Sequence, residues 1–372
     1  MKSVFLWVLI IASTSTYASD RMTSQIKGQI TTIVEGGIKD GQMSGAVVLI
    51  ASRSKILFEQ AYGNRLISES NEAMTVDTLF DLASITKPVA TATAVMHLIQ
   101  EEKIDVHQPV TKYLPEFKGN GKEAILVSEL LIHTGGLIPD NSLNDYKNGA
   151  DEAWKKICDL KMTAERGERF MYTDVGFIVL GKLVEKISGT DLNNFTRKNI
   201  FLPLGMKETG FLPSKELKQR AAATEKRDKK WMRGEVHDPR AYLLGGIAGH
   251  AGLFSTARDL GRFGQVMLSR GKEIPEVINE QTFQLMTTPR ATPRGTRTYG
   301  WDHRSPYSRN RGETLSDEAF GHGGFTGTVL WIDPAKDRVF VFLSSRLHPD
   351  GEGTVNAIAG EIATLIGQPS NL

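Results

Sequence analysis

Two pairs of strand-like runs near opposite ends of the chain constrain the fold more than any other feature of the sequence. Near the start, "GAVVLIA" (45–51) and "KILFEQAYG" (55–63) flank three polar residues, and near the end "GTVLWID" (327–333) and "DRVFVFLSS" (337–345) flank "PAK". Apolar, β-branched runs joined by such short links predict antiparallel hairpins. The strands of the predicted sheet therefore come from both ends of the chain.

Helical patterns occupy most of the sequence between these hairpins. Apolar residues recur at helical spacing in five central stretches and once near each end: 89–103, 127–134, 175–189, 191–201, 257–268, 22–41 and 354–367. We expect the two terminal helices to cover one sheet edge each. Strands at the ends and helices in the centre predict an α+β fold, an α/β sandwich in which an antiparallel sheet is flanked by helices and carries an inserted helical region.

The first 18 residues resemble a secretory signal peptide. Lys2 precedes an apolar run (4–12), and small polar residues lead to a predicted cleavage site near Ala18. A membrane anchor is the alternative, but the run is shorter than the roughly 20 residues that a spanning helix needs. Cys158 is the single cysteine, so the exported chain cannot form an internal disulfide. We therefore expect a periplasmic or secreted protein that depends on its apolar core.

Charge and spacing exclude several function classes. The 45 basic and 43 acidic residues give a net charge of +2, which lacks the basic excess of a nucleic-acid binder. The histidines lack the spacing of common zinc motifs, and His133 is interpreted as a loop-packing residue. The glycines of 245–252 are expected to form tight turns. The charged segment 214–235 and the Arg-, Gly- and Pro-rich segment 290–313 are both predicted to lie at the surface, the second as a long loop.

Ser84 and Lys87 stand three residues apart in "DLASITKPVA" (81–90), where a helical pattern begins. Residues at i and i+3 share a helix face, so the Lys87 amine would lie one turn from the Ser84 hydroxyl. That arrangement suits a lysine that takes the proton of a serine nucleophile. Pro88 fits a first helical turn, whose N–H groups have no internal acceptor. An ordinary serine-capped helix fits the same pattern, so the pair alone leaves both interpretations open.

Two further motifs occur downstream in a consistent order. "YTD" (172–174) precedes an amphipathic helical pattern, and "HGG" (322–324) precedes a predicted strand. With S-x-x-K, they resemble the three motifs of the serine β-lactamase and penicillin-binding-protein superfamily. The stretches 130–137, 200–211 and 236–260 resemble its class C β-lactamase-related branch. The resemblance covers essentially the whole chain after the predicted leader and implies that superfamily's fold.

The resemblance also implies roles for individual residues. Ser84 would be the acylated nucleophile, Lys87 its proton acceptor, and Tyr172 a second acid/base group that serves the leaving group and the deacylating water. Asp174 stands where the family most often has Asn. Because a carboxylate favours a charged lysine, either Lys87 or Tyr172 could be the principal base. The backbone N–H groups of Ser84 and Phe325 would form the oxyanion hole.

The third motif departs from the family pattern. His322 replaces the usual lysine and Gly323 the usual Thr or Ser, whereas Gly324 keeps the glycine. A neutral imidazole and a glycine offer less positive charge to a substrate carboxylate, so we do not expect efficient β-lactam hydrolysis. Arg346, after the last predicted strand, is a candidate carboxylate partner; a solvated surface arginine is the alternative.

These features predict an exported serine hydrolase that forms a Ser84 acyl-enzyme. The expected acyl donor is a D-amino-acid-containing peptidoglycan peptide, as for a DD-carboxypeptidase. A β-lactamase-related carboxylic ester hydrolase is the alternative, and a non-catalytic cell-wall binding module is a third, which the intact Ser84, Lys87 and Tyr172 disfavour. We expect no cofactor, metal, membrane anchor or obligate protein partner. The predicted boundaries are a signal peptide (1–18) and one hydrolase domain (19–372), with a sheet region (about 19–83 and 256–372) and a helical region (about 84–255).

Overall fold

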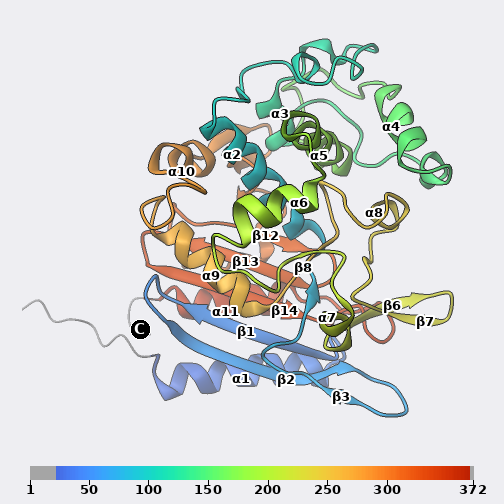
Figure 1. Ribbon diagram of the computed structural model, residues 1–372. Helices are drawn as coiled ribbons and strands as arrows, with labels where there is room; N and C mark the ends of the chain where they lie inside the picture. The colour runs from blue at the N-terminus through green and yellow to red at the C-terminus, as the bar shows by residue number, and fades with distance from the viewer. Residues whose placement is uncertain (1–21, 369–372) are drawn as a thin grey trace, which may run out of the picture.

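The two predicted hairpins lie side by side at the centre of one antiparallel sheet (Figure 1). The computed structural model describes residues 22–368, so the predicted signal peptide lies outside the described residues. Strand β1 (Gly45–Ala51) pairs with β2 (Ile56–Leu66) on one side and with β14 (Arg338–Ser344) on the other. Strand β14 in turn pairs with β13 (Thr328–Asp333). All residues of β1 are buried, because side chains pack on both of its faces.

Shorter strands extend the sheet on both sides. The order is β3-β2-β1-β14-β13-β12-β11-β10-β9, in which the outer strands are β3 (Glu72–Ala73), β12 (Phe320–Gly324), β11 (Asp302–Arg304), β10 (Gly295–Arg297) and β9 (Arg290–Thr292). The prediction of a long surface loop over 290–313 is therefore wrong. The segment pairs with β12 and buries Arg297 and Trp301 completely, and Asp302 gives the buried guanidinium a partner.

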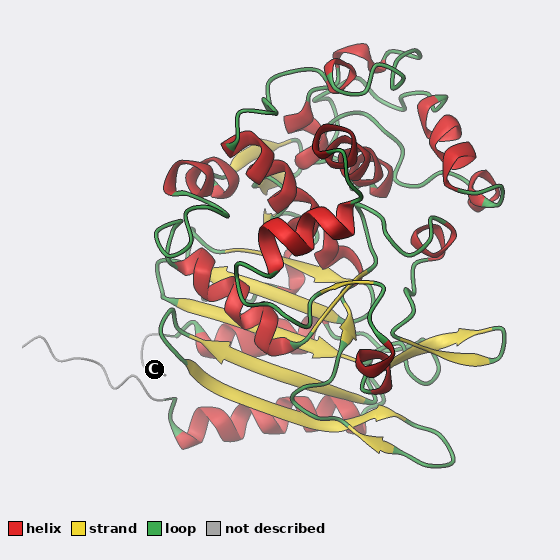
Figure 2. Ribbon diagram, viewed as in Figure 1, coloured by secondary structure: helices red, strands yellow, loops and turns green. Residues whose placement is uncertain are grey.

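Helices cover both faces of the sheet (Figure 2). Helices α1 (Ser24–Lys39) and α11 (Asn356–Ile366) share one apolar cluster with the sheet, and α9 (Ala257–Leu268) packs on the opposite face. The expectation that the terminal helices cover one sheet edge each is wrong, because they lie together on one face. Helix α1 precedes β1 and helix α11 follows β14, and these two strands are neighbours in the centre of the sheet. Both helices therefore lie beside the same part of the sheet.

Most of the remaining helices lie above the sheet in Figure 1 and pack into its larger apolar cluster, whereas α7 (Lys215–Gln219) and α8 (Pro239–Leu243) contribute to a separate small cluster. The others are α2 (Thr93–Gln100), α3 (Val127–Leu131), α4 (Ala150–Cys158), α5 (Asp174–Ser188), α6 (Leu192–Thr196) and α10 (Glu280–Thr287). The short strands β4 (Phe80–Asp81), β8 (Leu253–Ser255) and β5 (Gly210–Phe211) form a second sheet. The predicted boundary between sheet and helical regions stays a prediction.

The charged segment 214–235 forms α7 and a hairpin of β6 (Ala223–Arg227) and β7 (Lys230–Arg233) that projects from the body (Figure 1). Its tip is exposed, as predicted, although Ala221 and Ala223 at its base are buried. Within residues 22–368, no helix has the length and apolarity that a membrane span requires.

Candidate active site

Ser84 lies in a tight turn that connects the short strand β4 to helix α2. A single 3₁₀ turn (Ala83–Ile85) is followed by a π-helical segment (Lys87–Ala92) that continues into α2. Ala83 has a φ of +44°, a left-handed conformation that is unusual for a residue with a side chain. Such strain and π-helical turns both occur preferentially at functional sites. Ser84 is half-buried and is the middle residue of this 3₁₀ turn, one residue after the helical segment begins.

The Lys87 side chain is fully buried, and three oxygen atoms lie close to its ammonium group. Its Nζ lies 3.1 Å from Ser84 Oγ, 3.1 Å from the His250 carbonyl oxygen and 2.6 Å from Asp174 Oδ1. The contacts with Ser84 and His250 are hydrogen bonds, and the contact with Asp174 is an ion pair. This set of partners fits a protonated lysine that donates to Ser84.

The charges around Lys87 favour the same protonation state. Burial lowers the pKa of Lys87, but the negative charge of Asp174 and the Tyr172 hydroxyl outweigh it and raise the pKa well above its usual range. The expectation that Asp174 favours a charged Lys87 agrees with this direction. Lys87 is therefore positively charged at neutral pH in the unliganded site.

Tyr172 and Asp174 are held at the start of helix α5. The Thr173 side chain caps the helix by accepting the Gly176 N–H at 3.1 Å, which makes Asp174 the first residue of the helix, where a negative charge is favourable. Tyr172 precedes the cap, and its ring centroid lies 4.9 Å from Lys87 Nζ. Burial raises the pKa of Tyr172, and the Lys87 charge partly opposes that rise. Tyr172 is therefore a neutral phenol beside the ammonium group.

His133 supports Tyr172 from behind, a contact that sequence reasoning missed. The two rings stack with centroids 4.4 Å apart. The His133 Nδ1 accepts the Thr173 N–H at 3.1 Å, and its carbonyl oxygen accepts the Met171 N–H at 3.0 Å. Burial, with the charges of Arg297 and Lys87, holds the pKa of His133 well below its usual value. His133 is thus a packing residue, as interpreted, and the segment that it packs against carries Tyr172.

Strand β12 brings the third motif against the Ser84 turn. A Cβ atom at Gly324 would lie 2.4 Å from the Leu82 carbonyl oxygen, so only glycine permits this approach. The His322 Nδ1–H donates to the Gly323 carbonyl oxygen at 2.7 Å. Burial and the positive charges of Arg297 and Lys87 hold the pKa of His322 well below its usual value. His322 is therefore neutral, and its Nε2 is an acceptor without a partner among the described residues.

A pocket of about 400 Å³ opens beside these groups. It is lined by Ser84, Tyr172, His322, Gly323, Gly324, Phe325 and Arg346, together with Arg297, Asp302, Tyr307 and Asn310. Tyr307 also borders an adjoining pocket that reaches Asp174. The structure thus gathers all the predicted site residues, with Lys87 beneath Ser84. Arg297, Asp302, Tyr307 and Asn310 were missed because the sequence placed their segment in a surface loop.

Arg346 and Phe325 form one wall of the pocket. The guanidinium of Arg346 donates to the carbonyl oxygens of Phe325 and Gly353 and lies 4.4 Å from the centroid of the Phe325 ring. The Phe325 ring is 60% exposed and stacks on His237. Most of the Arg346 fork is therefore engaged by the backbone, which leaves less of it for a substrate carboxylate.

Arg297 has the opposite character. Its side chain is fully buried beside the pocket, and only Nη1 has a partner, Asp302 Oδ1 at 3.4 Å. Nε and Nη2 have no hydrogen-bond partner among the described residues. Burial lowers the pKa of Arg297 and Asp302 opposes that change, but an arginine keeps its charge in proteins. The positive charge that the third motif lacks is therefore supplied by β10.

Asp174, Asp238 and His250 lie close together behind Lys87, with potential ligand atoms within 4.8 Å of one another. The Lys87 ammonium contacts Asp174, and His250 Nε2 lies 2.9 Å from Asp238 Oδ1. The Lys87 ammonium thus takes the position on Asp174 that a cation would need.

The predicted tight turns at 245–252 are present, with φ values of +85°, +86° and +109° at Gly245, Gly246 and Gly252.

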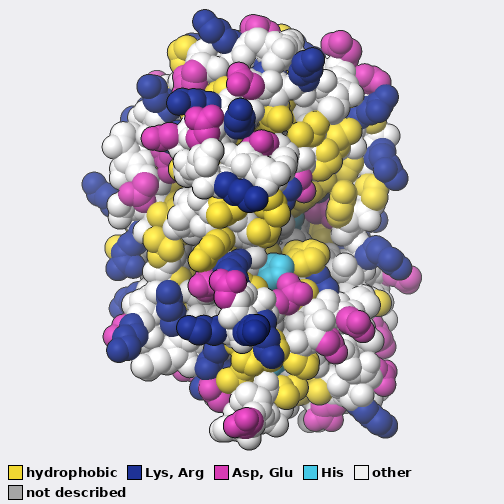
Figure 3. All heavy atoms as spheres, turned by 90° about the vertical axis from the view of Figure 1, so that its right-hand side faces the viewer, with side chains coloured by type: hydrophobic (Ala, Val, Ile, Leu, Met, Phe, Trp, Pro, Cys, Tyr) yellow, Lys and Arg dark blue, Asp and Glu magenta, His cyan; other side chains and the backbone are white. Residues whose placement is uncertain are grey.

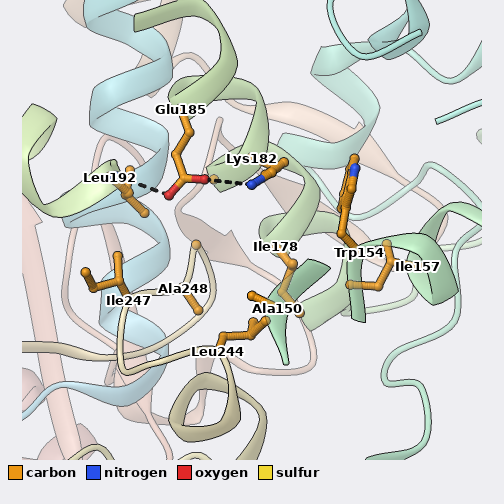
Figure 4. A pocket seen from close by; sticks show the side chains of 12 residues that line it. Ala150, Trp154, Ile157, Ile178, Lys182, Glu185, Leu192, Leu244, Ile247 and Ala248 are labelled. Atoms are coloured by element: carbon orange, nitrogen blue, oxygen red, sulfur yellow. Dashed lines mark hydrogen bonds and ion pairs between the residues drawn. The ribbon is translucent and has the colours of Figure 1, made fainter. Parts of the chain in front are cut away.

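A separate apolar pocket lies on the other side of the 247–249 loop (Figure 4). Its walls are Trp154, Ile157, Ile178, Leu192, Leu244 and Ile247, and its rim carries an ion pair of Lys182 and Glu185. It contains no nucleophile, so the chemistry belongs to the Ser84 pocket.

Figure 3 shows the side of the molecule that carries α8, where a histidine reaches the surface at a hollow between apolar and acidic side chains.

A serine beside a buried lysine and tyrosine, against a glycine-rich strand, is an arrangement that can perform acyl transfer. A family model described as Beta-lactamase matches residues 30–364. The chain belongs to the β-lactamase family. It is a hydrolase of the serine β-lactamase and penicillin-binding-protein superfamily, as the sequence analysis expected.

Curated members of this β-lactamase family are similar over most of their length. An N-acetylmuramyl-L-alanine amidase of Bacillus subtilis (strain 168) is 32% identical over 95% of this chain and 88% of its own. A protein of Escherichia coli (strain K12), provisionally named a D-alanyl-D-alanine carboxypeptidase, is 31% identical over 81% of this chain and 78% of its own.

Solved structures share the β-lactamase-type fold at low identity. A class C β-lactamase matches with a TM-score of 0.75 and 18% identity, over 92% of this chain and 97% of its own. A penicillin-binding-protein homologue from Caulobacter crescentus matches with a TM-score of 0.73 and 18% identity over the same shares. These matches confirm the predicted fold class.

Proposed function

We propose that this protein is an exported serine hydrolase that acts on D-amino-acid-containing cell-wall peptides through a Ser84 acyl-enzyme, in the manner of a DD-carboxypeptidase. Ser84 Oγ attacks the carbonyl carbon of the scissile amide, and the backbone N–H groups of Ser84 and Phe325 bind the developing oxyanion. The C–N bond then breaks, and the amine leaves with a proton. Water hydrolyses the ester and restores Ser84.

The proton steps are shared between Lys87 and Tyr172. Because the raised pKa of Lys87 keeps it protonated, Lys87 can accept the Ser84 proton only after it has given up one of its own. Asp174, 2.6 Å away, is the nearest basic group to that ammonium. Tyr172, as a neutral phenol, is suited to protonate the leaving amine. We propose Lys87 as the base for Ser84 and Tyr172 as the acid for the leaving group.

The choice of substrate rests on the buried Arg297 beside the pocket. A buried cation whose donors lack acceptors is costly, by several kcal/mol for an ion without compensation. A substrate carboxylate would satisfy the free Nε and Nη2 donors, and an arginine fork matches a carboxylate with two hydrogen bonds. The Asp302 carboxylate offsets part of the Arg297 charge through Nη1. Nε and Nη2 are the two donors that remain for a substrate carboxylate. A peptide that ends in a D-amino-acid carboxylate meets this requirement.

The pocket favours the esterase alternative less. A neutral ester needs no carboxylate partner, whereas Arg297 brings a positive charge to the pocket that Ser84 lines. A second candidate function is hydrolysis of the amide bond between a muramyl group and L-alanine. It is supported by the Bacillus subtilis amidase, which matches nearly the whole chain. Both candidates place a peptidoglycan fragment in the pocket.

Turnover of a small substrate panel separates these functions. The panel contains a diacetyl-L-Lys-D-Ala-D-Ala peptide, its C-terminal amide, an N-acetylmuramyl-L-alanyl peptide, a short-chain nitrophenyl ester and nitrocefin. The proposal expects the free-acid D-Ala-D-Ala peptide to have the highest kcat/KM. Preference for the muramyl peptide would establish the amidase instead, and turnover of the ester alone would contradict both.

Export is a separate part of the proposal and depends on residues 1–18. We expect the full chain to appear in the periplasm or medium of a bacterial host without these residues, and a chain that starts at residue 19 to stay in the cytoplasm. Fractionation with N-terminal sequencing measures both. Retention of the uncleaved full chain in the cytoplasm would contradict export.

Replacing Asp174 with Asn, the usual family residue, is expected to shift the pH dependence of kcat/KM to lower pH. Asp174 raises the pKa of Lys87, and Lys87 must be neutral to accept a proton, so wild-type activity should increase with pH as the neutral fraction of Lys87 grows. Removal of a carboxylate at this distance lowers a lysine pKa by about 1 to 3 units. The alkaline rise should therefore move by at least one pH unit, as measured with the nitrophenyl ester.

Asp140→Asn is the matched control, because Asp140 is an acidic neighbour of the site that does not contact Lys87. Its profile should follow the wild type. An unchanged profile in Asp174→Asn would show that the Lys87 proton does not limit the reaction and would leave Tyr172 as the principal base.

A further inference from the structure

Asp81, the last residue of β4, holds two separate backbone segments with its two carboxylate oxygens. Oδ1 accepts the N–H of Ala83 at 2.8 Å, and Oδ2 accepts the N–H of His237 at 2.7 Å. The side chain is only 6% exposed and does not line the Ser84 pocket. Asp81 therefore contacts neither the reacting atoms nor solvent to any large extent, and its position calls for another explanation.

The first of these bonds fixes the Leu82–Ala83 peptide unit, one residue before the nucleophile. Ala83 adopts a φ of +44°, which disfavours any residue with a side chain. A carboxylate that accepts the N–H two residues later stabilises such a turn. Because Ala83 precedes Ser84 directly, the bond sets the direction of the Ser84 N–H, one of the two proposed oxyanion donors. A carboxylate at residue 81 thus holds one side of the oxyanion hole.

Further contacts connect Asp81 to the Phe325 side of the oxyanion hole. The Asp81 carbonyl oxygen accepts the Thr326 hydroxyl at 2.6 Å, directly after Phe325, the residue of the second proposed donor. The His237 ring stacks on the Phe325 ring, with centroids 5.5 Å apart. Asp81 thus reaches the Phe325 turn through its own carbonyl group and through His237.

We infer that Asp81 is a positioning residue that fixes the two oxyanion N–H donors relative to each other. The inference rests on the proposed Ser84 acyl-enzyme but not on the identity of its substrate. A carboxylate has two acceptor oxygens, whereas an asparagine amide has one, so Asp81→Asn keeps the shape and loses one of the two N–H bonds. Removal of an oxyanion donor lowers kcat by about 100- to 1000-fold in other enzymes, and misplacement of one is expected to cost about 100-fold.

Asp333→Asn is the matched control. Asp333 is also a buried carboxylate that accepts a backbone N–H, that of Ser316 at 2.8 Å, and it lies at the opposite end of β13 from the site. On a nitrophenyl ester, Asp81→Asn should lower kcat about 100-fold with KM within threefold of wild type. Its affinity for a boronic acid, which forms a tetrahedral adduct with the serine, should fall in parallel. Asp333→Asn should lower Tm to a similar extent and leave kcat and boronate affinity unchanged.

Equal kcat values for the two variants would overturn the inference, as would a loss confined to KM. If Asp81→Asn does not fold, Thr326→Val removes the hydroxyl that Asp81 holds and should show the same loss in kcat alone; a wild-type kcat would overturn the inference. Fluorophosphonate labelling separates this result from failure of the proposed function. Absence of label on wild-type Ser84 contradicts the acyl-enzyme itself, whereas equal labelling rates of wild type and Asp81→Asn contradict only the role of Asp81.

Discussion

Replacing Ser84 with alanine is expected to lower kcat about a million-fold for every acyl donor. The Ser84 hydroxyl lines the pocket and accepts a hydrogen bond from Lys87, and alanine offers no atom that can form the ester. Oxyanion binding and substrate positioning would remain, and these alone give about a thousandfold or more over the reaction in water. Burst kinetics with a nitrophenyl ester should show neither the burst nor steady turnover.

Ser52→Ala provides the control for this experiment. The Ser52 hydroxyl is also hydrogen-bonded, but Ser52 is buried in the link between β1 and β2, away from the pocket. Its kinetics should equal those of the wild type. Turnover by Ser84→Ala within tenfold of wild type would require another nucleophile and would contradict the proposed mechanism.

Replacing Arg297 with glutamine is expected to lower kcat/KM about 100-fold for a D-Ala-D-Ala peptide with a free C-terminal carboxylate. Loss of one partner of a buried charge pair costs about 2 to 5 kcal/mol, and the Nε and Nη2 donors of Arg297 have no other partner among the described residues. The same variant should hydrolyse the C-terminal amide of that peptide, or a neutral ester, at nearly the wild-type rate. The ratio between acid and amide substrates is independent of how much variant protein is folded.

Arg311→Gln is the matched control for Arg297. Arg311 is also a buried arginine, but its guanidinium donates to the carbonyl oxygens of Leu315 and Ser316 and does not line the Ser84 pocket. Its acid-to-amide ratio should stay at the wild-type value. An unchanged ratio in Arg297→Gln would show that Arg297 stabilises the fold only, and the carboxylate partner would then be sought at Arg346.

Local patterns in the sequence were sufficient to predict the central elements of the fold. The strands β1, β13 and β14 are mostly apolar, β2 mixes apolar with polar residues, and each pair is joined by a short link, so each hairpin could be predicted without knowledge of its neighbours. The helices α5 and α9 have strong apolar periodicity. The pairing of β1 with β14 depends on contacts between residues far apart in the sequence, which is why the shared face of the terminal helices was not foreseen.

The same distinction explains what was predicted of the site. Ser84, Lys87 and Tyr172 were found because their motifs are local and keep a fixed order. Arg297 was missed, because an arginine among Arg, Gly and Pro residues normally indicates a solvated loop and its burial depends on pairing with Asp302. The sequence around Asp81 did not indicate its role, since its partner His237 lies more than 150 residues away. Residues that act through long-range hydrogen bonds leave little trace in a single sequence.

The protonation of the site also required the structure. The sequence indicated that a carboxylate at Asp174 would favour a charged Lys87, but not that His250 and Ser84 would accept the other two N–H groups. With two hydrogen bonds and the ion pair to Asp174, the resting lysine is an ammonium ion, and a neutral Tyr172 lies beside it. The division of acid and base roles between the two follows from these contacts.

The most direct test of the central claim is the mass of the protein during turnover. Wild-type enzyme is mixed with diacetyl-L-Lys-D-Ala-D-Ala, quenched in acid within the first turnovers, and analysed intact and after digestion. We expect an added mass equal to the peptide without its last D-alanine, located on Ser84 and absent from Ser84→Ala. Release of D-alanine by wild type without any adduct on Ser84, or with an adduct on a different residue, would contradict it.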